Sequence, residues 1–259
     1  MPKFSANLTM QFNEVDFLDR FVRSKRAGFK AVEYMFPYDW SKEQLVEALE
    51  SNGLTQVLHN LPAGNWAVGE RGIACLPGRE GEFQDGVGAA IEYAKALKCP
   101  ALNCLVGLTP QDKAENETQQ TLVANLKFAA EALEKEGIKL LVESLNDLDI
   151  PGFHLVRTQD TLNLLTEIGH SNLWIQYDIY HAQKMEGNLT ETIRKNLDRI
   201  AHIQLADNPG RHEPGTGEIN FPNLFRDIDK AGYKGWIGCE YIPAGVTEDG
   251  LGWFEPYKS

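Results

Sequence analysis

The sequence lacks the features of several large classes of protein. No apolar run in its 259 residues approaches the roughly 18 consecutive residues that a membrane-spanning helix requires. The N-terminal segment MPKFSANLTM also lacks the basic start and long apolar stretch of a secretory signal peptide. We therefore expect neither a membrane span nor secretion.

Clusters of positive charge are missing as well. The chain has 25 Lys and Arg residues against 37 Asp and Glu residues, a formal net charge of −12, and no run of basic residues. Such a chain would repel a phosphate backbone or an anionic membrane surface. The charge therefore argues against nucleic acid and membranes and leaves a small molecule as the expected partner.

Cysteines are few and show no pairing motif. The four cysteines, at positions 75, 99, 104 and 239, form no CxxC pair and have mostly apolar neighbours. This pattern predicts buried free thiols, as in a protein kept in the reducing cytoplasm.

What the chain does contain is a regular alternation of β-type and helical segments. The predicted strands are Phe4–Leu8, Ala31–Met35, Thr55–Asn60, Ala101–Val106, Lys139–Glu143, Leu173–Asp178, Ala201–Leu205 and Trp236–Glu240. The predicted helices are Asp16–Ala27, Lys42–Ser51, Glu82–Leu97, Thr121–Glu136, Thr158–Ile168, Thr190–Leu197 and Phe221–Ala231. Eight units in 259 residues average about 32 residues each, a normal length for a βα unit.

This alternation predicts parallel strands with helical crossovers, in either a closed barrel or an open sheet. An open sheet for nucleotides would have a glycine fingerprint after the first strand, whereas the chain reads TMQFNEVDF there. No Pro-, Gly- or Ser-rich linker divides the chain. The sequence therefore predicts an α/β fold, a (β/α)8 TIM barrel, with residues 1–259 forming a single domain.

Four predicted strands end in a side chain able to bind a hard cation. These are Glu143, Asp178, Gln204 and Glu240, from strands five to eight. Active sites of TIM barrels lie where the strands end, and three carboxylates there repel one another unless a cation or protons intervene. Because all four donors are oxygens, the pattern predicts a divalent metal site, for Mg²⁺ or Mn²⁺ rather than structural zinc.

Further polar residues are expected at the same face. His181 follows Asp178 by three residues, and His59 lies near the end of the third strand, so both are predicted to bind the substrate. The loop Gly64–Arg79 is longer than ordinary connections and contains Arg71, which predicts a lid or binding element.

Several of these stretches resemble the bacterial hydroxypyruvate isomerases. The resemblance extends from Phe4 nearly to Tyr257 and rests on ANLTMQF, FPYDW, LHNLPAGNWAVGERGIACLPGRE, IQYDIYH, HIQLADNPGRHEPGTGEIN and GWIGCEY. The loop LPAG…ERGI…PGRE favours this branch over the similar 2-oxo-tetronate isomerases. The wider superfamily is similar to xylose isomerase in its barrel and includes ketose 3-epimerases, inosose dehydratases and endonuclease IV.

The resemblance implies a reaction and a set of roles. It implies interconversion of hydroxypyruvate and tartronate semialdehyde without an organic cofactor, with metal and catalytic positions at Glu143, Asp178, Gln204 and Glu240. Glu143 and Glu240 are implied to be the pair that handles protons. Many epimerase relatives have histidine where this chain has Gln204. Moving a carbonyl between adjacent carbons passes through an enediolate, for which a carboxylate on each side serves as base and acid. Arg211 or Arg71 is expected to bind the carboxylate of a 2-oxo acid substrate.

Four other functions remain open at this point. A 2-oxo-tetronate isomerase or a ketose 3-epimerase would use the same barrel for a different substrate. A nuclease similar to endonuclease IV would need several zinc ions and a basic face, against which the net charge of −12 argues. A sugar-acid binding protein would not need the second glutamate. The sequence also leaves open the substrate's chain length, the metal, and whether the chain forms a homo-oligomer.

Overall fold

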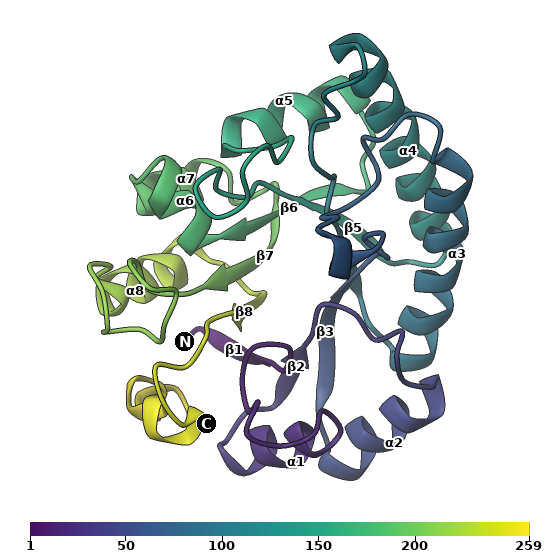
Figure 1. The fold of residues 1–259 in the computed structure, drawn as a ribbon. Coiled ribbons are helices and arrows are strands. Elements are labelled where there is room, and N and C mark those ends of the chain that lie inside the picture. Colours follow the sequence, from purple (N-terminus) through teal and green to yellow (C-terminus); the bar gives the residue numbers. More distant parts are fainter. Residues whose placement is uncertain (259) are drawn as a thin grey trace.

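The computed structural model describes residues 1–258 as a closed barrel of parallel strands surrounded by helices (Figure 1). Its strands are β1 (Lys3–Asn7), β2 (Ala31–Glu33), β3 (Thr55–Asn60), β4 (Ala101–Cys104), β5 (Lys139–Glu143), β6 (Leu173–Asp178), β7 (Ile200–Leu205) and β8 (Trp236–Cys239). Each strand pairs with the next along the chain, and β8 closes the ring on β1 with Trp236 opposite Lys3. The predicted fold class, a TIM barrel, is confirmed.

Helices cover the outside of this ring. They are α1 (Asp19–Arg26), α2 (Lys42–Asn52), α3 (Glu80–Leu97), α4 (Glu115–Lys135), α5 (Thr158–Ile168), α6 (Ile179–Met185), α7 (Leu189–Lys195) and α8 (Phe221–Ala231), with two 3₁₀ segments, η1 (Trp66–Val68) and η2 (Thr247–Tyr257). In α2, the hydroxyl of Ser41 accepts a hydrogen bond from the N–H of Gln44 at the start, and Gly53 adopts φ +57° at the end. These are ordinary start and stop signals of helices.

The bounds of several helices differ from the prediction by up to three residues, and two helices differ more. Helix α4 begins at Glu115, earlier than the expected Thr121. Helix α6 was not predicted, because Ile179 and Tyr180 continue the β-type pattern of β6. A side chain at the barrel mouth starts it, since Asp178 Oδ1 accepts a hydrogen bond from the N–H of Tyr180 at 2.7 Å.

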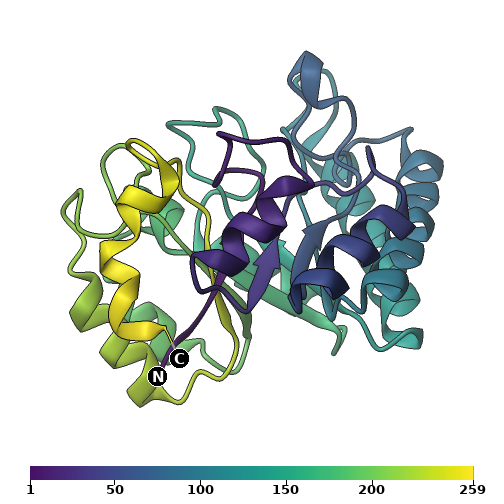
Figure 2. The same ribbon diagram turned by 90° about the horizontal axis from the view of Figure 1, so that it is seen from below.

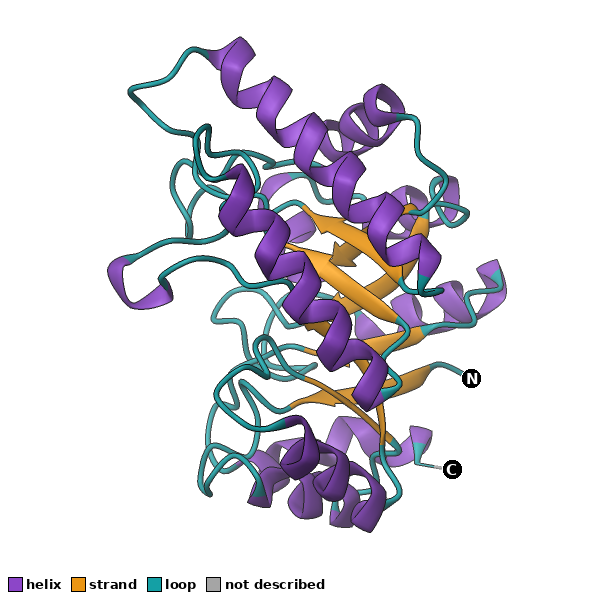
Figure 3. Ribbon diagram, turned by 90° about the vertical axis from the view of Figure 1, so that its right-hand side faces the viewer, coloured by secondary structure: helices purple, strands orange, loops and turns teal. Residues whose placement is uncertain are grey.

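The longer loops gather at the end of the barrel where the strands finish (Figure 3). The loop after β3 extends furthest and carries η1 at its tip, in blue in Figure 2. Both termini lie together near the opposite end (Figure 2). This arrangement places the ends of β5 to β8, and the loops that follow them, around one mouth.

The C-terminal segment η2 completes the outer layer beside β1. The ring of Phe254 is 3% exposed and stacks on Phe29, with centroids 4.4 Å apart. Trp253 contacts Phe4 of β1 edge to face at 5.2 Å. Segment η2 therefore covers β1 with aromatic rings, in the position of the helix that would follow β8.

The state of the cysteines matches the prediction. All four cysteines are buried and free, as predicted. Among residues 1–258, no helix is both long and apolar enough to cross a membrane.

Replacing Phe254 with alanine should lower the free energy of unfolding by about 3–5 kcal/mol, because the change leaves a cavity beneath η2. Urea unfolding followed by circular dichroism measures this value. The control is Leu148→Ala, which removes a side chain that is 70% exposed and should change stability by less than about 0.5 kcal/mol. Equal losses in the two variants would contradict a stabilising role for η2.

Candidate active site

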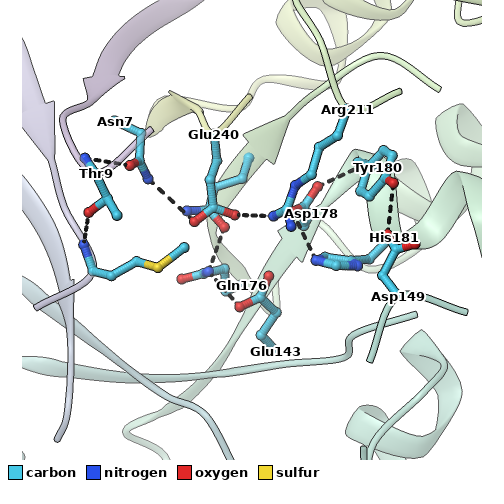
Figure 4. Close-up of polar contacts among 12 residues, drawn as sticks. Asn7, Thr9, Glu143, Asp149, Gln176, Asp178, Tyr180, His181, Arg211 and Glu240 are labelled. Carbon is cyan, nitrogen blue, oxygen red and sulfur yellow. Dashed lines mark hydrogen bonds and ion pairs between the residues drawn. The ribbon is translucent and has the colours of Figure 1, made fainter. Parts of the chain in front are cut away.

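Three carboxylates meet at the mouth of the barrel. Glu143 ends β5, Asp178 ends β6 and Glu240 directly follows β8 (Figure 4). Their exposed fractions are 3%, 3% and 6%. The closed ring brings these strand ends together although they lie far apart in the sequence.

One guanidinium lies among these carboxylates. Arg211 Nη2 is 2.8 Å from Glu240 Oε2 and 3.6 Å from Asp178 Oδ2. The guanidinium also lies 5.1 Å from the centre of the Tyr180 ring, a distance suited to a cation–π contact. Arg211 therefore links the loop after β7 to the acidic centre of the mouth.

The carboxylates carry more negative charge than one arginine balances. Burial raises the pKa of Glu143 well above its ordinary value, and the charges of Glu240 and Asp178 raise it further. Burial likewise raises the pKa of Asp178, and it raises that of Glu240 to about 8 despite Arg211. The site must therefore hold protons or a cation at neutral pH.

The donor set fits a divalent cation. Within residues 1–258, Glu143 Oε1 and Asp178 Oδ2 are buried and have no hydrogen-bond partner. Asp178 uses its other oxygen to start α6, so Oδ2 is free to face the centre. One ligand atom each of Glu143, Asp178 and His181 lies within 4.8 Å of the others. Buried carboxylate oxygens suit a hard cation such as Mg²⁺ or Mn²⁺.

His181 presents a donor rather than a lone pair to the centre. Its Nδ1 accepts a hydrogen bond from the backbone N–H of Asn146 at 3.1 Å. Burial and the nearby Arg211 lower the pKa of His181 well below its ordinary value, so the ring is neutral. A neutral ring that accepts at Nδ1 carries its proton on Nε2, which lies 3.6 Å from Asp178 Oδ2. His181 is thus placed to donate to a substrate oxygen, the kind of role predicted for it.

Amide side chains form the floor beneath the carboxylates. Asn7 Nδ2 donates to Glu240 at 3.3 Å and to Glu33 at 3.2 Å. Gln176 Nε2 donates to Glu143 at 2.9 Å, and Asn103 Nδ2 donates to the same oxygen at 3.1 Å. Each of the two glutamates is therefore oriented by neutral donors that do not themselves titrate.

A buried contact between Glu33 and His202 supports this floor. Glu33 is 1% exposed and lies 2.8 Å from Nε2 of His202, with a further hydrogen bond of 2.9 Å from Ser5. Burial alone would raise the pKa of Glu33, but the contacts with His202, Gln204 and Ser5 lower it. Gly238 of β8 leaves the space, because a Cβ there would lie 2.2 Å from a Glu33 oxygen.

Gln204, predicted to be a metal ligand, lies within this floor. Its Oε1 accepts a hydrogen bond from Gln176 at 2.6 Å and its Nε2 donates to Glu33 at 2.8 Å. Both ends of the amide are therefore occupied by protein groups. The structure brings together Glu143, Asp178, Glu240, Arg211 and His181 but turns the oxygen of Gln204 toward Gln176.

His59 does not reach the mouth. It pairs with Leu102 in the β3–β4 register, while the neighbouring Asn60 contacts Asn103 on the inner face. The His59 ring contacts Gln56 and Tyr38 and is fully buried. The alternation of side chains along β3 directs position 59 toward the helices, so the substrate contact predicted for His59 has no support from this position.

Arg71 lies on the long loop after β3, as predicted, but contacts the loop itself. Its guanidinium stacks on the Trp66 ring at 3.9 Å and donates to the carbonyls of Trp66 and Glu70. Arg79 pairs with Glu70 and so ties the two arms of this loop together. In this conformation Arg71 binds its own loop and has no recorded contact with the carboxylate cluster.

Sequence reasoning missed the residues that support the site. They are Asn7, Glu33, Asn103, Gln176 and Asn146, the last of which donates a hydrogen bond to His181. Glu33 could have been found, since AVE ends a strand with a carboxylate just as LLVE does. The amides carry no such signal, because Asn and Gln at strand ends are common without function.

Comparisons with known proteins agree with this geometry. Residues 21–257 match the family described as xylose isomerase-like TIM barrel. The chain is 56% identical to the hydroxypyruvate isomerase of Escherichia coli, with all of both chains covered. It is 45% identical to the 2-oxo-tetronate isomerase of Cupriavidus necator over 99% of both chains. A crystal structure described as an AP endonuclease, family 2, from Brucella melitensis superimposes with a TM-score of 0.98 at 45% identity, covering all of both chains.

The chain therefore belongs to the xylose isomerase-like TIM barrel family. Within that family it belongs with the hydroxypyruvate and 2-oxo-tetronate isomerases. The family and the isomerase class predicted from the sequence are confirmed.

The buried position of His59 predicts a pH dependence of stability. Burial lowers its pKa in the fold from 6.5 to about 3, so only the unfolded chain takes up this proton between these values. Stability is therefore lost as pH falls from 6.5 toward 3, by up to about 1.4 kcal/mol per pH unit. His59→Asn keeps an acceptor but does not titrate, so its stability should fall less steeply. Urea unfolding between pH 4 and 7 measures both slopes, and equal slopes would contradict the assignment.

Proposed function

We propose that this chain interconverts hydroxypyruvate and tartronate semialdehyde at the mouth of its barrel. The observation that carries the proposal is the pair of buried glutamates, Glu143 and Glu240, on separated strands and both with raised pKa values. A binding protein would not need two such groups around one small molecule. The 56% identity to the E. coli hydroxypyruvate isomerase supports this choice of substrate.

The reaction moves one hydrogen between adjacent carbons. A carboxylate removes a proton from C3 of hydroxypyruvate, the resulting enediolate is protonated at C2, and the hydroxyl proton passes from the C3 oxygen to the C2 oxygen. Glu143 and Glu240 act as base and acid, and their raised pKa values suit proton exchange near neutral pH. Asn103 and Gln176 on one side, and Asn7 on the other, keep the two carboxyl groups oriented.

Arg211 and His181 bind the substrate in this proposal. Arg211 already lies against the acidic centre, and a guanidinium can hold a carboxylate through two hydrogen bonds. The Nε2 proton of His181 can donate to the oxygen on C2 or C3, where negative charge develops. Arg71 would contribute only if the loop after β3 moved over the mouth.

We also propose that Glu143, Asp178 and Glu240 hold a divalent cation, Mg²⁺ or Mn²⁺. The buried oxygens of Glu143 and Asp178 that lack a hydrogen-bond partner, and the raised pKa values of all three carboxyl groups, support this set. Gln204 would join it only after its oxygen had left Gln176. When bound, such a cation supplies stabilisation of the negative charge of the enediolate.

A four-carbon substrate is the second candidate. The 45% identity to a 2-oxo-tetronate isomerase favours it, and that reaction needs the same acid–base pair. Cleavage of abasic DNA, suggested by the description of the Brucella structure, fits less well. The net charge of −12 and the carboxylates of the mouth would repel a phosphate backbone.

Turnover assays with hydroxypyruvate, a four-carbon 2-oxo acid and abasic DNA test this function. We expect hydroxypyruvate to be converted with the highest kcat/KM. A higher value for the four-carbon acid would move the assignment to the second candidate, and DNA cleavage alone would overturn it. The same assay with a chelator, and metal analysis of Asp178→Asn, test the cation. Full activity of a protein shown to be free of metal would remove the cation from the proposal.

The proton route predicts incorporation of solvent hydrogen. Turnover in D2O should place deuterium on C2 of tartronate semialdehyde at low conversion, because an enzyme carboxyl exchanges its proton with water. Glu143→Gln and Glu240→Gln should each lower kcat by about 100-fold or more with a smaller change in KM. Mass analysis of the product measures the label. Full retention of the substrate hydrogen together with an active Glu143→Gln variant would rule out the route.

A further inference from the structure

The loop after β7 is built around one buried carboxylate, that of Asp207. This side chain is completely buried. Its Oδ1 accepts hydrogen bonds from the N–H groups of Asn208 at 2.9 Å and Ile219 at 3.1 Å, and its Oδ2 accepts one from Gly215 at 2.9 Å. Within residues 1–258 no Lys, Arg or His forms a salt bridge with Asp207, so backbone N–H groups supply its partners. One carboxylate thus gathers both ends of a loop of twelve residues.

The backbone of the same loop holds Arg211 in an unusual conformation. Arg211 has φ +58°, which residues other than glycine rarely adopt. Its N–H donates to the carbonyl of Asp207 at 3.1 Å, and its own carbonyl accepts from the N–H of Ile242, after β8, at 2.8 Å. A strained residue of this kind persists only where its surroundings fix it, and such residues cluster at ligand clamps.

Close packing leaves no room for a side chain at Gly217. A Cβ there would lie 2.2 Å from the carbonyl oxygen of Asn208 and 2.6 Å from Asp207 Oδ1. The N–H of Glu218 also donates to the Asn208 carbonyl at 2.7 Å. The return strand of the loop therefore lies directly against the Asp207 carboxylate.

We propose that Asp207 is the positioning residue for Arg211: its carboxylate fixes the loop so that the guanidinium reaches Glu240 and Asp178. Arg211 is long and could take many rotamers from a mobile loop, and its charge would then spread over the mouth. A fixed backbone limits it to one approach, beside Tyr180. The inference rests on the proposed function, in which Arg211 binds the substrate carboxylate.

The experiment is a double-mutant cycle with Asp207→Asn and Arg211→Ala. Asparagine keeps one acceptor oxygen but presents an NH2 group to the N–H of Gly215, so the loop should loosen while the barrel stays folded. We expect Asp207→Asn to lower kcat/KM for hydroxypyruvate about 10-fold in the native background and less than about 2-fold in the Arg211→Ala background, because coupled residues are not additive. A merely structural role would give equal losses in both backgrounds, which would overturn the proposal. Native kinetics of Asp207→Asn would overturn it as well, whereas native kinetics of Arg211→Ala would overturn the proposed substrate-binding role of Arg211.

A second variant and a control complete the test. Gly217→Ala pushes the loop from its other side and should show the same dependence on Arg211, which keeps the test decisive if Asp207→Asn does not fold. Ser41→Ala removes a side-chain bond to a backbone N–H at α2, outside the mouth, and should leave kcat/KM unchanged in both backgrounds.

A crystal structure of Asp207→Asn separates this inference from the proposed reaction. We expect Arg211 to have left Glu240. A guanidinium still 2.8 Å from Glu240 would overturn the positioning role whatever the substrate is. Absence of turnover in the native protein, with Arg211 displaced in the variant, would overturn the proposed function alone.

Discussion

Three buried carboxylates that share one guanidinium are the constraint on which the mouth of this barrel depends. Left ionised in a dry pocket, Glu143, Asp178 and Glu240 would drive one another apart, and burial raises the pKa of each. The fold tolerates them because Arg211 lies against Asp178 and Glu240, and two amide donors orient one oxygen of Glu143. The same crowding raises the pKa values, which favours proton exchange, and it favours the binding of a cation. The repulsion among these carboxylates that opposes folding is therefore also what suits them to the proposed chemistry.

The closed ring of strands makes this arrangement possible. In an open sheet, β1 and β8 would be edges, and Asn7 could not contact both Glu33 and Glu240. Most TIM barrels fill the interior with branched apolar side chains, whereas the upper interior here is a set of amides around the Glu33–His202 pair. Amides hold the carboxyl groups in place without exchanging protons with them. The amides thus separate the two glutamates proposed to handle protons from the Glu33–His202 contact below.

Much of the fold and part of the site could be predicted from the sequence. The alternation of β-type and helical segments predicts the barrel, and Glu143 and Asp178 are visible because each ends an apolar strand. His59 shows the limit of such predictions. A shift of one residue along β3 moves a side chain from the interior of the barrel to the helix layer, and the sequence does not fix that register. Asp207 was visible only as a polar loop residue. Its carboxylate accepts hydrogen bonds from N–H groups up to twelve positions away, and composition and periodicity do not predict these contacts.

Gly238 in β8 constrains which residues can occupy position 33 in β2. Because any side chain at this position in β8 would overlap the carboxylate of Glu33 in β2, position 238 cannot take a larger residue while Glu33 stays as it is. A larger residue at 238 requires a smaller one at 33, and that exchange would leave His202 without its partner. We therefore expect the two positions to vary together among relatives, with position 202 following them. Such covariation would record a contact across the barrel between residues 205 positions apart (238 − 33).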